Sequence, residues 1–367
     1  MVFEEFGFFV SQICSRCPLF ADRPLLWTII ANSEAGGFTI KSRWKKHRLT
    51  LSQCARKAEK NPLRRNSGPS KTARSEGGAT GSLGLIPSRF AGHAKEITGA
   101  LIKEAAEITA GPRPFFLVIT AGGDGTSRDV MSSLYHAPPE IRQNFAVLRL
   151  PMGTANDGAD AFDLDKALDL IIEPSKVHYQ RALRLSTASG KGPFLAFNIL
   201  SAGIDAFVTH MTNKMKGKLP GDSYKLWVDI AALFYDIIFK VDYIDVRSFD
   251  GEGNEVKAFC EKLLLIAVGE SGRRCYGSRK WILPDERNVC AIKQMSLIKK
   301  LILKGLLPRG THINKPETIL WNAQSVEFNA RQIILAQMDG ETVRLEAGDY
   351  PAIIELTEPL IPILVKS

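Results

Sequence analysis

Three glycines surround a single carboxylate at the point where an apolar segment gives way to an amphipathic one. The stretch FFLVITAGGDGTSRDVMSSL, residues 115–134, contains in order Gly122, Gly123, Asp124, Gly125 and Thr126. Because glycine has no side chain, successive backbone N–H groups can converge there on an anion, and a helix that follows adds its positive end. These residues favour a phosphate site. The alternative is a tight strand-to-helix turn with Thr126 as its cap.

Asp124 narrows the chemistry of that site. A bare carboxylate facing a polyphosphate repels it, unless a divalent cation lies between them or the carboxylate turns toward a ribose or backbone amides. The glycine turn therefore predicts a phosphate, with a divalent cation, a ribose or backbone amides beside Asp124.

Two further loops combine small and polar residues in the same way. PMGTANDGAD, residues 151–160, follows the apolar segment 146–150, and NSEAGG, residues 32–37, follows the apolar segment 25–31. The small and polar residues of these loops include Asn32, Ser33, Ala35, Gly36, Gly153, Thr154, Asn156 and Asp157. Ligands of open parallel sheets bind at the carboxyl ends of the strands, so we expect the three loops to converge on one site.

An acidic pair stands near the end of the chain. The segment QMDGE, residues 337–341, carries Asp339 and Glu341. Asp-Gly is a favoured pair for a two-residue hairpin of type I′, so the segment alone predicts a hairpin turn. A carboxylate is also what an attacking alcohol needs in order to lose its proton. Given the three loops upstream, we favour the catalytic interpretation.

The elements that must position these residues form an alternating pattern in the first half of the chain. Strands are expected at 25–31, 115–120 and 146–150, and amphipathic helices follow at 93–108 and 164–172. Strand, loop and helix in repetition predict a parallel sheet covered by helices.

The second half of the chain has a different sequence pattern. After about residue 175, short apolar segments alternate with polar turns, which predicts an antiparallel sheet. Helices are expected within it at 222–239 and 295–307. The domain boundaries that follow are 25–160 for the α/β domain, 161–345 for the β-rich domain, and 346–367 for a C-terminal segment that returns toward the first domain.

Composition indicates a globular protein of two domains with a regional excess of positive charge. The chain has 367 residues, 45% of them hydrophobic, and a formal charge of +9. Residues 41–74 carry twelve Lys or Arg against Glu59 alone. This tract continues into a segment rich in Gly, Ser and Pro, so 41–84 is expected to be a basic, mobile insertion.

Targeting signals and cysteine usage favour the cytoplasm. No apolar run reaches eighteen residues, and the N-terminus lacks the basic start and apolar centre of a signal peptide. The six cysteines are scattered, and the Cys14–Cys17 pair lacks two further zinc ligands at similar spacing. We interpret them as incidental thiols in a reducing compartment.

Taken in order, the motifs IIANSEAGG, GGDGTSRDVMSSL, LPMGTANDGA and QMDGE resemble the diacylglycerol kinase catalytic domain, in the bacterial lipid-kinase branch that includes sphingosine and ceramide kinases. FNILSAGIDAFV, residues 197–208, is a looser fifth match. The resemblance implies an N-terminal Rossmann-like nucleotide domain, a C-terminal antiparallel β-sandwich and an active site in the cleft. It also implies transfer of the ATP γ-phosphoryl group to the hydroxyl of diacylglycerol or a related lipid.

The same resemblance implies roles for individual residues. Glu341 matches the proposed proton acceptor, and Asp339 is its close rival. The nucleotide would be lined by Asn32, Ser33, Ala35, Gly36, Gly122, Gly123, Asp124, Gly125, Thr126, Asp129, Gly153, Thr154 and Asn156.

Several positions depart from the family pattern. Ser33 replaces a proline, and Asp129 replaces a glutamate that is one methylene longer. WILPDERNVCAI, residues 281–292, lacks the glycine of the family's structural magnesium site, where Asp285 and Glu286 would have to serve. The threonine that the family has near Arg89 finds no clear match.

The expected cofactors and partners follow from the resemblance: ATP, Mg²⁺ and a lipid substrate. The basic tract, with Trp44, could hold the protein on an anionic membrane at the inner face, although a charge run is commonly a solvated surface. Nucleic acid is not expected, because the tract lacks interleaved aromatics. Oligomeric state is open, a homodimer included. The alternatives are an NAD kinase, which lacks a GTAND loop, and a nucleotide-binding relative without turnover.

Overall fold

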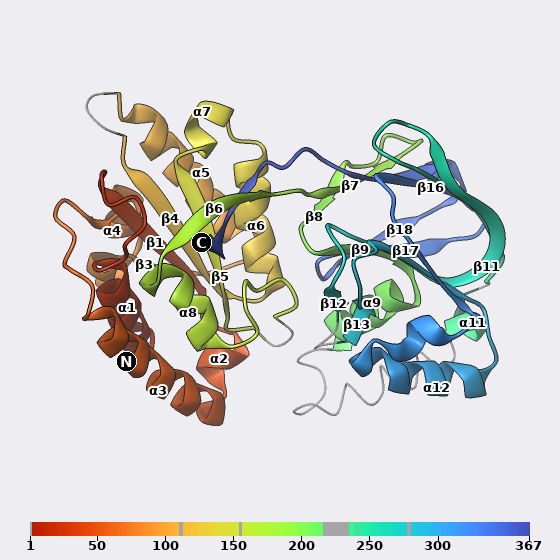
Figure 1. Ribbon diagram of the computed structural model, residues 1–367, viewed down its shortest axis with the longest axis horizontal. Helices are drawn as coiled ribbons and strands as arrows, with labels where there is room; N and C mark the ends of the chain where they lie inside the picture. Colours follow the sequence, from red (N-terminus) through yellow and green to blue (C-terminus); the bar gives the residue numbers. More distant parts are fainter. Residues whose placement is uncertain (1, 110–112, 154–155, 216–234, 240, 277–279) are drawn as a thin grey trace. The chain divides into compact units, whose positions relative to one another are not determined.

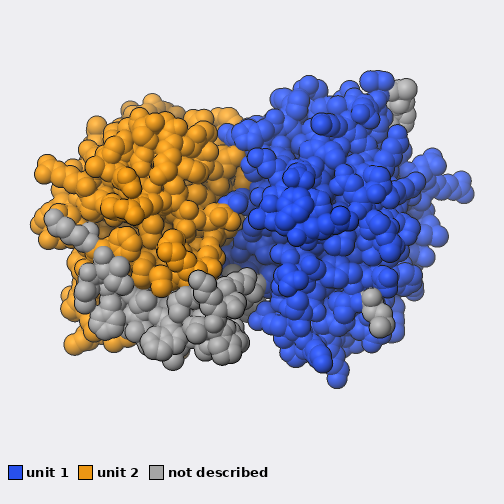
Figure 2. All heavy atoms as spheres, turned by 180° about the vertical axis from the view of Figure 1, so that it is seen from behind, with its two compact units in different colours: residues 1–180, 359–367 blue, residues 181–358 orange. Residues whose placement is uncertain are grey.

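The computed structural model describes residues 2–109, 113–153, 156–215, 235–239, 241–276 and 280–367. It divides the chain into unit 1, residues 1–180 with 359–367, and unit 2, residues 181–358 (Figures 1 and 2). The expected boundary at 160/161 differs from this division, because the strand β6 (Ser175–Gln180) joins the sheet of unit 1.

Unit 1 contains the parallel sheet that the sequence predicts. Strand β1 (Leu25–Asn32) pairs in parallel with β4 (Phe115–Gly122), and β4 pairs in parallel with β5 (Phe145–Pro151). The full order is β2-β1-β4-β5-β20-β6, and β3 also pairs with β1. The remaining strands of the sheet are β2 (Gly68–Pro69), β3 (Leu85–Ser88) and β20 (Ile361–Lys366). Every residue of β4 is buried, as a continuous apolar strand in the middle of a parallel sheet requires.

Helices cover both faces of this sheet (Figure 1). Alternate residues of β4 separate the two cores: Phe115, Leu117 and Ile119 belong to one, and Phe116 and Val118 to the other. The first core is completed by the helices α1 (Val2–Cys14), α3 (Lys41–Ala58) and α8 (Leu164–Ile172), and the second by α4 (Lys71–Glu76), α5 (His93–Glu107), α6 (Asp124–Tyr135) and α7 (Pro139–Arg142).

The basic tract differs from the expected mobile insertion. Its first part is the helix α3, which buries Leu51, Cys54, Ala55 and Ala58 against the sheet. Residues 61–84 contain β2, α4 and the 3-10 helix η1 (Gly78–Leu83). The apolar positions of α3 recur at helical spacing on one side, and the density of lysines and arginines on the other sides concealed them.

Two features at the start of the chain explain how that tract is held. The helix α1 buries Phe6, Val10 and Ile13 in the first core, a role the sequence did not assign to residues 1–24. The Arg64 guanidinium donates hydrogen bonds to backbone carbonyls of this region, including that of Phe20 at 2.6 Å. Burial raises the pKa of the Cys17 thiol to about 11, so it is protonated at neutral pH.

Unit 2 is a curled antiparallel sheet with an apolar interior. Its order is β18-β17-β9-β11-β10-β16-β19-β7-β8, with β14 and β15 continuing from β11. The long strand β11 (Glu255–Gly269) pairs with β10 through its first half and with β9 and β14 through its second half. It therefore joins two differently paired parts of the sheet. This confirms the predicted β-rich domain. The other strands are β7 (Leu183–Thr187), β8 (Phe194–Ala196), β9 (Ile199–Gly203), β10 (Tyr243–Phe249), β14 (Val289–Lys293), β15 (Thr318–Trp321), β16 (Ser325–Asn329), β17 (Ile334–Met338), β18 (Glu341–Leu345) and β19 (Ala352–Leu356), with a separate hairpin of β12 (Arg274–Tyr276) and β13 (Lys280–Leu283).

Among the described residues of unit 2, the helices that pack on the strands are α9 (Ile204–Met215), α11 (Tyr235–Ile238) and α12 (Leu297–Leu306). The helix predicted at 295–307 is confirmed as α12. Most of the helix predicted at 222–239 lies outside the described residues, apart from the short α11. Within the part of the chain that the structure describes, no helix is both long enough and apolar enough to span a membrane.

The C-terminal segment is divided between the units. Strand β19 stays in the sheet of unit 2, where it pairs with β7 and β16. Only residues 359–367 join unit 1, where β20 pairs in parallel with β5 and antiparallel with β6.

Candidate functional site

The three glycine-bearing loops lie together at one edge of the sheet of unit 1. The register pairs Ala31 with Ala121 and Gly122 with Pro151, so β1, β4 and β5 end at the same level. A Cβ atom added to Gly153 would lie 2.7 Å from the Cα atom of Gly123. The loops after β4 and β5 therefore come into contact at Gly153, where no side chain would fit.

The loop after β1 belongs to the same cluster. A Cβ added to Gly122 would lie 3.2 Å from Asn32 Cβ and 2.6 Å from Thr126 Oγ1. The N–H of Gly37, in the short helix α2 (Gly36–Thr39), donates to the carbonyl oxygen of Met152 at 2.9 Å. The convergence predicted from the sequence is therefore present in unit 1.

At two positions of the cluster, the fold itself does not require a glycine. Gly123 has an extended backbone with φ −89°, and Gly125 lies within the first turn of α6. A Cβ added to either would meet nothing within 4 Å. Glycine inside a helix costs about 1 kcal/mol relative to alanine. A bare backbone at these two positions is what an anion needs to reach the N–H groups at the start of α6.

Asp124 faces its neighbouring loop. Its Oδ1 atom accepts a hydrogen bond from the N–H of Gly158 at 3.0 Å. Burial raises the pKa of this carboxyl above its ordinary value. Backbone hydrogen bonds, that from Gly158 first, and the nearby positive charge of Arg149 offset part of this rise. Of the partners the sequence allowed for Asp124, the structure provides the backbone amide of the loop after β5.

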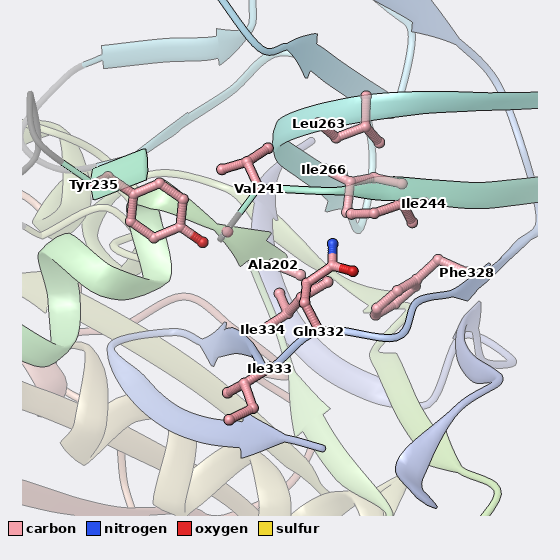
Figure 3. A pocket seen from close by; sticks show the side chains of 11 residues that line it. Ala202, Tyr235, Val241, Ile244, Leu263, Ile266, Phe328, Gln332, Ile333 and Ile334 are labelled. Carbon is pink, nitrogen blue, oxygen red and sulfur yellow. The ribbon is translucent and has the colours of Figure 1, made fainter. Parts of the chain in front are cut away.

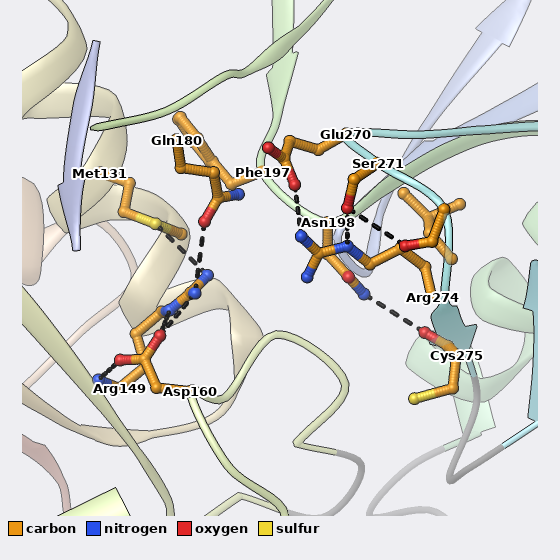
Figure 4. A network of polar contacts seen from close by, with 12 residues as sticks. Met131, Arg149, Asp160, Gln180, Phe197, Asn198, Glu270, Ser271, Arg274 and Cys275 are labelled. Carbon is orange, nitrogen blue, oxygen red and sulfur yellow. Dashed lines mark hydrogen bonds and ion pairs between the residues drawn. The ribbon is translucent and has the colours of Figure 1, made fainter. Parts of the chain in front are cut away.

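A buried ion pair holds the loop after β5 at both ends (Figure 4). The Arg149 guanidinium donates to Asp160 Oδ1 at 2.6 and 2.8 Å, and Asp160 Oδ2 accepts the N–H of Arg149 at 2.6 Å. The two side chains are 5% and 3% exposed. Arg149 also donates to Gln180 Oε1 at 3.3 Å. Sequence reasoning missed this pair, although PMGTANDGAD ends on the aspartate.

The remaining predicted nucleotide residues are placed around this cluster. Asn32 forms a turn in which its Oδ1 accepts the N–H of Glu34 at 3.0 Å, and half-buried Ser33 lies within that turn. Asn156 adopts a left-handed backbone with φ 59° and donates to the carbonyl of Pro151. Ala35 and Gly36 are buried, Asp129 lies on α6 beside Arg128, and Thr154 lies outside the described residues.

One residue near the cluster could not be assigned from the sequence. Strand β3 ends at Ser88, whose Cα atom pairs in register with that of Asn32. A serine hydroxyl therefore stands one residue before Arg89, where the family pattern led us to expect a threonine. The position emerges only once β3 is known to run parallel to β1 on its outer side.

In unit 2, QMDGE forms the predicted hairpin between β17 and β18. Asp339 and Gly340 have φ of 45° and 95°, the left-handed pair of a type I′ turn, and Met338 pairs with Glu341. The Asp339 carboxylate accepts hydrogen bonds from the N–H groups of Asn198 at 3.1 Å and Ile199 at 3.3 Å, and also from that of Phe197. Its oxygens are thus committed to the backbone, whereas Glu341, at the start of β18, is exposed.

A chain of polar contacts leads from this hairpin into the unit. Gly340 N–H donates to Gln337 Oε1 at 3.1 Å, and Gln337 Nε2 donates to Ser201 Oγ at 2.9 Å. Ser201 in turn donates to Asp205, in the first turn of α9. Burial raises the pKa of Asp205 to about 6. The sequence marked SAGIDA as a motif without giving these residues a role.

Helix α9 also contacts the hairpin directly. His210 Nδ1 lies 3.3 Å from Thr342 Oγ1, and Asn213 Nδ2 donates to the carbonyl of Gly340 at 2.9 Å. Together with the Asp339 contacts, these bonds fix the hairpin from two sides. Glu341 is therefore an exposed residue next to a turn that hydrogen bonds hold on both sides.

The predicted magnesium pair does not fit a metal site. Asp285 forms a bidentate ion pair with Arg287, with Nε lying 3.0 and 3.1 Å from the two carboxylate oxygens. Glu286 pairs with Arg273 at 2.6 Å. No cluster of three or more His, Cys, Asp or Glu that could hold a metal is present among the described residues. Both carboxylates are paired with arginines, so the residues present do not fit a magnesium site.

Unit 2 also contains a small apolar cavity between its layers (Figure 3). It is lined by aliphatic side chains such as Ile244 and Ile266, with Phe328, Tyr235 and the amide of Gln332. Its volume of about 10 Å³ holds no more than a water-sized group. A lipid chain would enter only if the strands moved apart.

Comparison with known proteins agrees with this architecture. The family model described as the diacylglycerol kinase catalytic domain matches residues 27–182. The chain is 31% identical over 231 residues to a Yersinia enterocolitica protein named "Probable lipid kinase YegS-like", covering 61% of this chain and 71% of that one. It is 26% identical over 271 residues to a diacylglycerol kinase of Bacillus subtilis, covering 70% and 81%.

Solved structures share the fold. The crystal structure of a candidate diacylglycerol kinase from Bacillus anthracis superposes with a TM-score of 0.55 at 17% identity, and the match covers 93% of this chain and 94% of that one. A second structure from the same organism gives 0.53 at 16% identity, with coverage of 93% and 96%. At these identities the similarity establishes the two-domain fold.

Proposed function

Because the chain belongs to the family of lipid kinases that share the diacylglycerol kinase catalytic domain, we propose that it transfers the γ-phosphoryl group of ATP to the hydroxyl of diacylglycerol or a related lipid. The observation that carries the proposal is the convergence of three loops around Gly123 and Gly125. The fold has room for a side chain at both positions, yet both are glycine. A phosphate approaching the start of α6 accounts for them.

The nucleotide end of the site is assigned to unit 1. The triphosphate is assigned to the N–H groups of Gly123, Asp124 and Gly125, and Thr154 and Asn156 are assigned as further nucleotide-binding residues. Asn32 and Ser33 complete the rim, with Ala35 and Gly36 behind them. ATP would bind as its Mg²⁺ complex, and the ion would supply positive charge that offsets the charge of the phosphates.

The acceptor end is assigned to the hairpin of unit 2, with Glu341 as the general base. The Glu341 carboxylate takes the proton of the lipid hydroxyl, the hydroxyl oxygen bonds to the γ-phosphorus, and the bond to the β-phosphate oxygen breaks to release ADP. Asp339 is the weaker candidate, because its oxygens already accept three backbone N–H groups. We assign it the role of holding the turn.

The proposal requires that the hydroxyl presented on unit 2 reach the γ-phosphate bound on unit 1 during the reaction. It also requires that the protein reach a membrane, since its acceptor resides there. Peripheral attachment to an anionic bilayer meets that need, and Glu341 then acts on the hydroxyl of a lipid at the membrane surface.

A panel of acceptors tests the proposal. Purified protein is incubated with MgATP and, separately, diacylglycerol, a sphingoid base, an isoprenoid alcohol and NAD, and products are identified by mass. We expect a phosphorylated lipid. Phosphorylated NAD would make the protein an NAD kinase. Nucleotide binding without any product would favour a non-catalytic relative. The ion pairs of Asp285 and Glu286 with arginines support that outcome, because these two carboxylates were the expected magnesium ligands.

A further inference from the structure

Helix α12 of unit 2 buries a lysine and exposes several large aliphatic side chains. Its Lys300 side chain is only 6% exposed and pairs with Asp236. The residues that face outward are aliphatic: Leu297 is 42% exposed, Ile298 71%, Leu301 50% and Ile302 52%. Four large apolar side chains gathered on one short helix form a patch, unlike the single exposed apolar residues that most surfaces carry.

These four residues, which we call the α12 arc, share one side of the helix. At about 100° per residue, Leu297, Leu301, Ile298 and Ile302 follow one another around an arc of about 140°. Gly305 falls inside the arc and adds no bulk. On the same geometry, Lys304 lies about 20° beyond one edge of the arc, and Lys299 lies about 60° beyond the other, where it pairs with Glu317.

The arc is held outward by contacts on the opposite side of the helix. Leu303 is buried in the core of the unit. The Asp236 carboxylate accepts hydrogen bonds from Lys300 Nζ and from Gln294 Nε2, the latter at 2.6 Å. Turning α12 to bury its leucines would break the Lys300–Asp236 pair and expose Leu303, so the arc is a fixed feature of the folded unit.

The sequence around the arc is basic. From Val289 to Glu317 it contains Lys293, Lys299, Lys300, Lys304, Arg309 and Lys315 against Glu317 alone. Three of these lysines pair with acidic side chains: Lys293 with Glu261, Lys299 with Glu317 and Lys300 with Asp236. An exposed aliphatic surface in a basic part of the chain matches the boundary between the acyl chains and the headgroups of an anionic bilayer, where the apolar side enters and basic side chains extend toward the phosphates.

We propose that the α12 arc is the membrane-docking surface of this protein and that its occupant is an anionic lipid bilayer. The inference rests on the proposed function in one respect, that a lipid kinase works at a membrane surface. It moves the membrane contact away from residues 41–74, because the apolar side of α3 is buried and its outer side exposes Leu49 among charged residues.

Vesicle binding of the full chain tests this docking surface. The partition coefficient is measured by co-sedimentation with phosphatidylglycerol-containing vesicles and with pure phosphatidylcholine vesicles. Ile298→Gln/Ile302→Gln should weaken binding to the anionic vesicles by about ten-fold or more, since two aliphatic side chains no longer enter the interface. The matched control is Leu49→Gln/Leu63→Gln, which alters two residues of unit 1 that are 61% and 64% exposed and should change nothing.

A spectroscopic readout distinguishes insertion from loss of folding. In a Cys260→Ser background, which removes the exposed thiol, Leu301→Cys carrying an environment-sensitive dye should shift to the blue when vesicles are added. Leu49→Cys should not shift. Wild-type partitioning by Ile298→Gln/Ile302→Gln, or an unshifted dye at residue 301, would overturn the inference.

Two further measurements separate this inference from its rivals. If light scattering shows a dimer that Ile298→Gln/Ile302→Gln converts to a monomer, while vesicle binding is unchanged, a second copy of the chain covers the arc and the inference is wrong. Phosphorylation of a short-chain diacylglycerol dispersed without vesicles should be equal in wild type and variant. If no lipid is phosphorylated but the vesicle results hold, docking stands and the proposed function fails.

Discussion

The Asp124 carboxylate on α6 accepts the backbone N–H of Gly158 at 3.0 Å, which ties the loop after β4 to the loop after β5. Removing the carboxylate should release both loops. We expect Asp124→Ala to weaken MgATP binding by about 100-fold, as loss of a charge-assisted hydrogen bond and of loop order would do. Asp124→Asn keeps an acceptor oxygen for Gly158 and should remain within about ten-fold of wild type. Calorimetric titration measures both, and equal losses would mean that the charge itself binds the ligand.

Gly125 separates the needs of the fold from those of the ligand. A Cβ there meets nothing within 4 Å, so Gly125→Ala should keep or slightly raise the thermal unfolding midpoint. The same methyl group would obstruct a phosphate at the start of α6, and MgATP binding should fall at least about ten-fold. Gly99→Ala, also in a helix and also free of neighbours within 4 Å, is the matched control and should bind ATP normally. Normal binding by Gly125→Ala would place the phosphate elsewhere.

The Arg149–Asp160 pair should show strong coupling. Arg149→Met leaves a buried carboxylate without its partner, and we expect a loss of about 3 kcal/mol in the free energy of unfolding. Asp160→Asn should lose a similar amount. The double variant removes both charges, while the amide oxygen introduced at position 160 can still accept the backbone N–H of residue 149, so it should be less destabilised than the sum by about 2 kcal/mol. Additive losses in urea unfolding would contradict this role.

The raised pKa of Asp205 makes the stability of unit 2 depend on pH in a defined direction. Its folded pKa of about 6 lies above the ordinary value of 3.8, so between these values the folded state keeps a proton that the unfolded state releases. Stability therefore falls as pH rises from about 4 to about 6 and is level above that. Relative to wild type, Asp205→Asn should gain about 2 to 3 kcal/mol over that range. A constant difference between the two proteins across this range would contradict the buried, protonated carboxyl.

The sheet and the loop cluster could be predicted because their signals are local. The apolar run of β4 and the glycines that follow it are adjacent in sequence, and parallel strands necessarily end at one edge. The DG turn likewise has its own short signature. These elements required no knowledge of distant contacts.

What could not be predicted depends on register between distant segments. Gln337 meets Ser201 because β17 pairs with β9, and no local pattern reveals that pairing. The basic tract was misinterpreted for a different reason, since counting charges hid the apolar side of α3 at Leu51, Cys54 and Ala58. The exposure of the α12 arc could not be predicted either. Helical periodicity in the sequence identifies an apolar side of a helix, but it does not show whether that side faces a core or the solvent.

Glu341 is the residue on which the proposed reaction depends most directly. Wild type, Glu341→Gln and Asp339→Asn are compared in a single-turnover assay that follows labelled γ-phosphate from ATP into diacylglycerol, with MgATP affinity and unfolding midpoint measured on the same preparations. Asp339→Asn turns one amide N–H toward a backbone N–H donor, so it should lower stability by about 1 to 3 kcal/mol. We predict that Glu341→Gln binds MgATP and unfolds as wild type does, yet transfers phosphate at least about 100-fold more slowly. Transfer at the wild-type rate by Glu341→Gln would contradict the account.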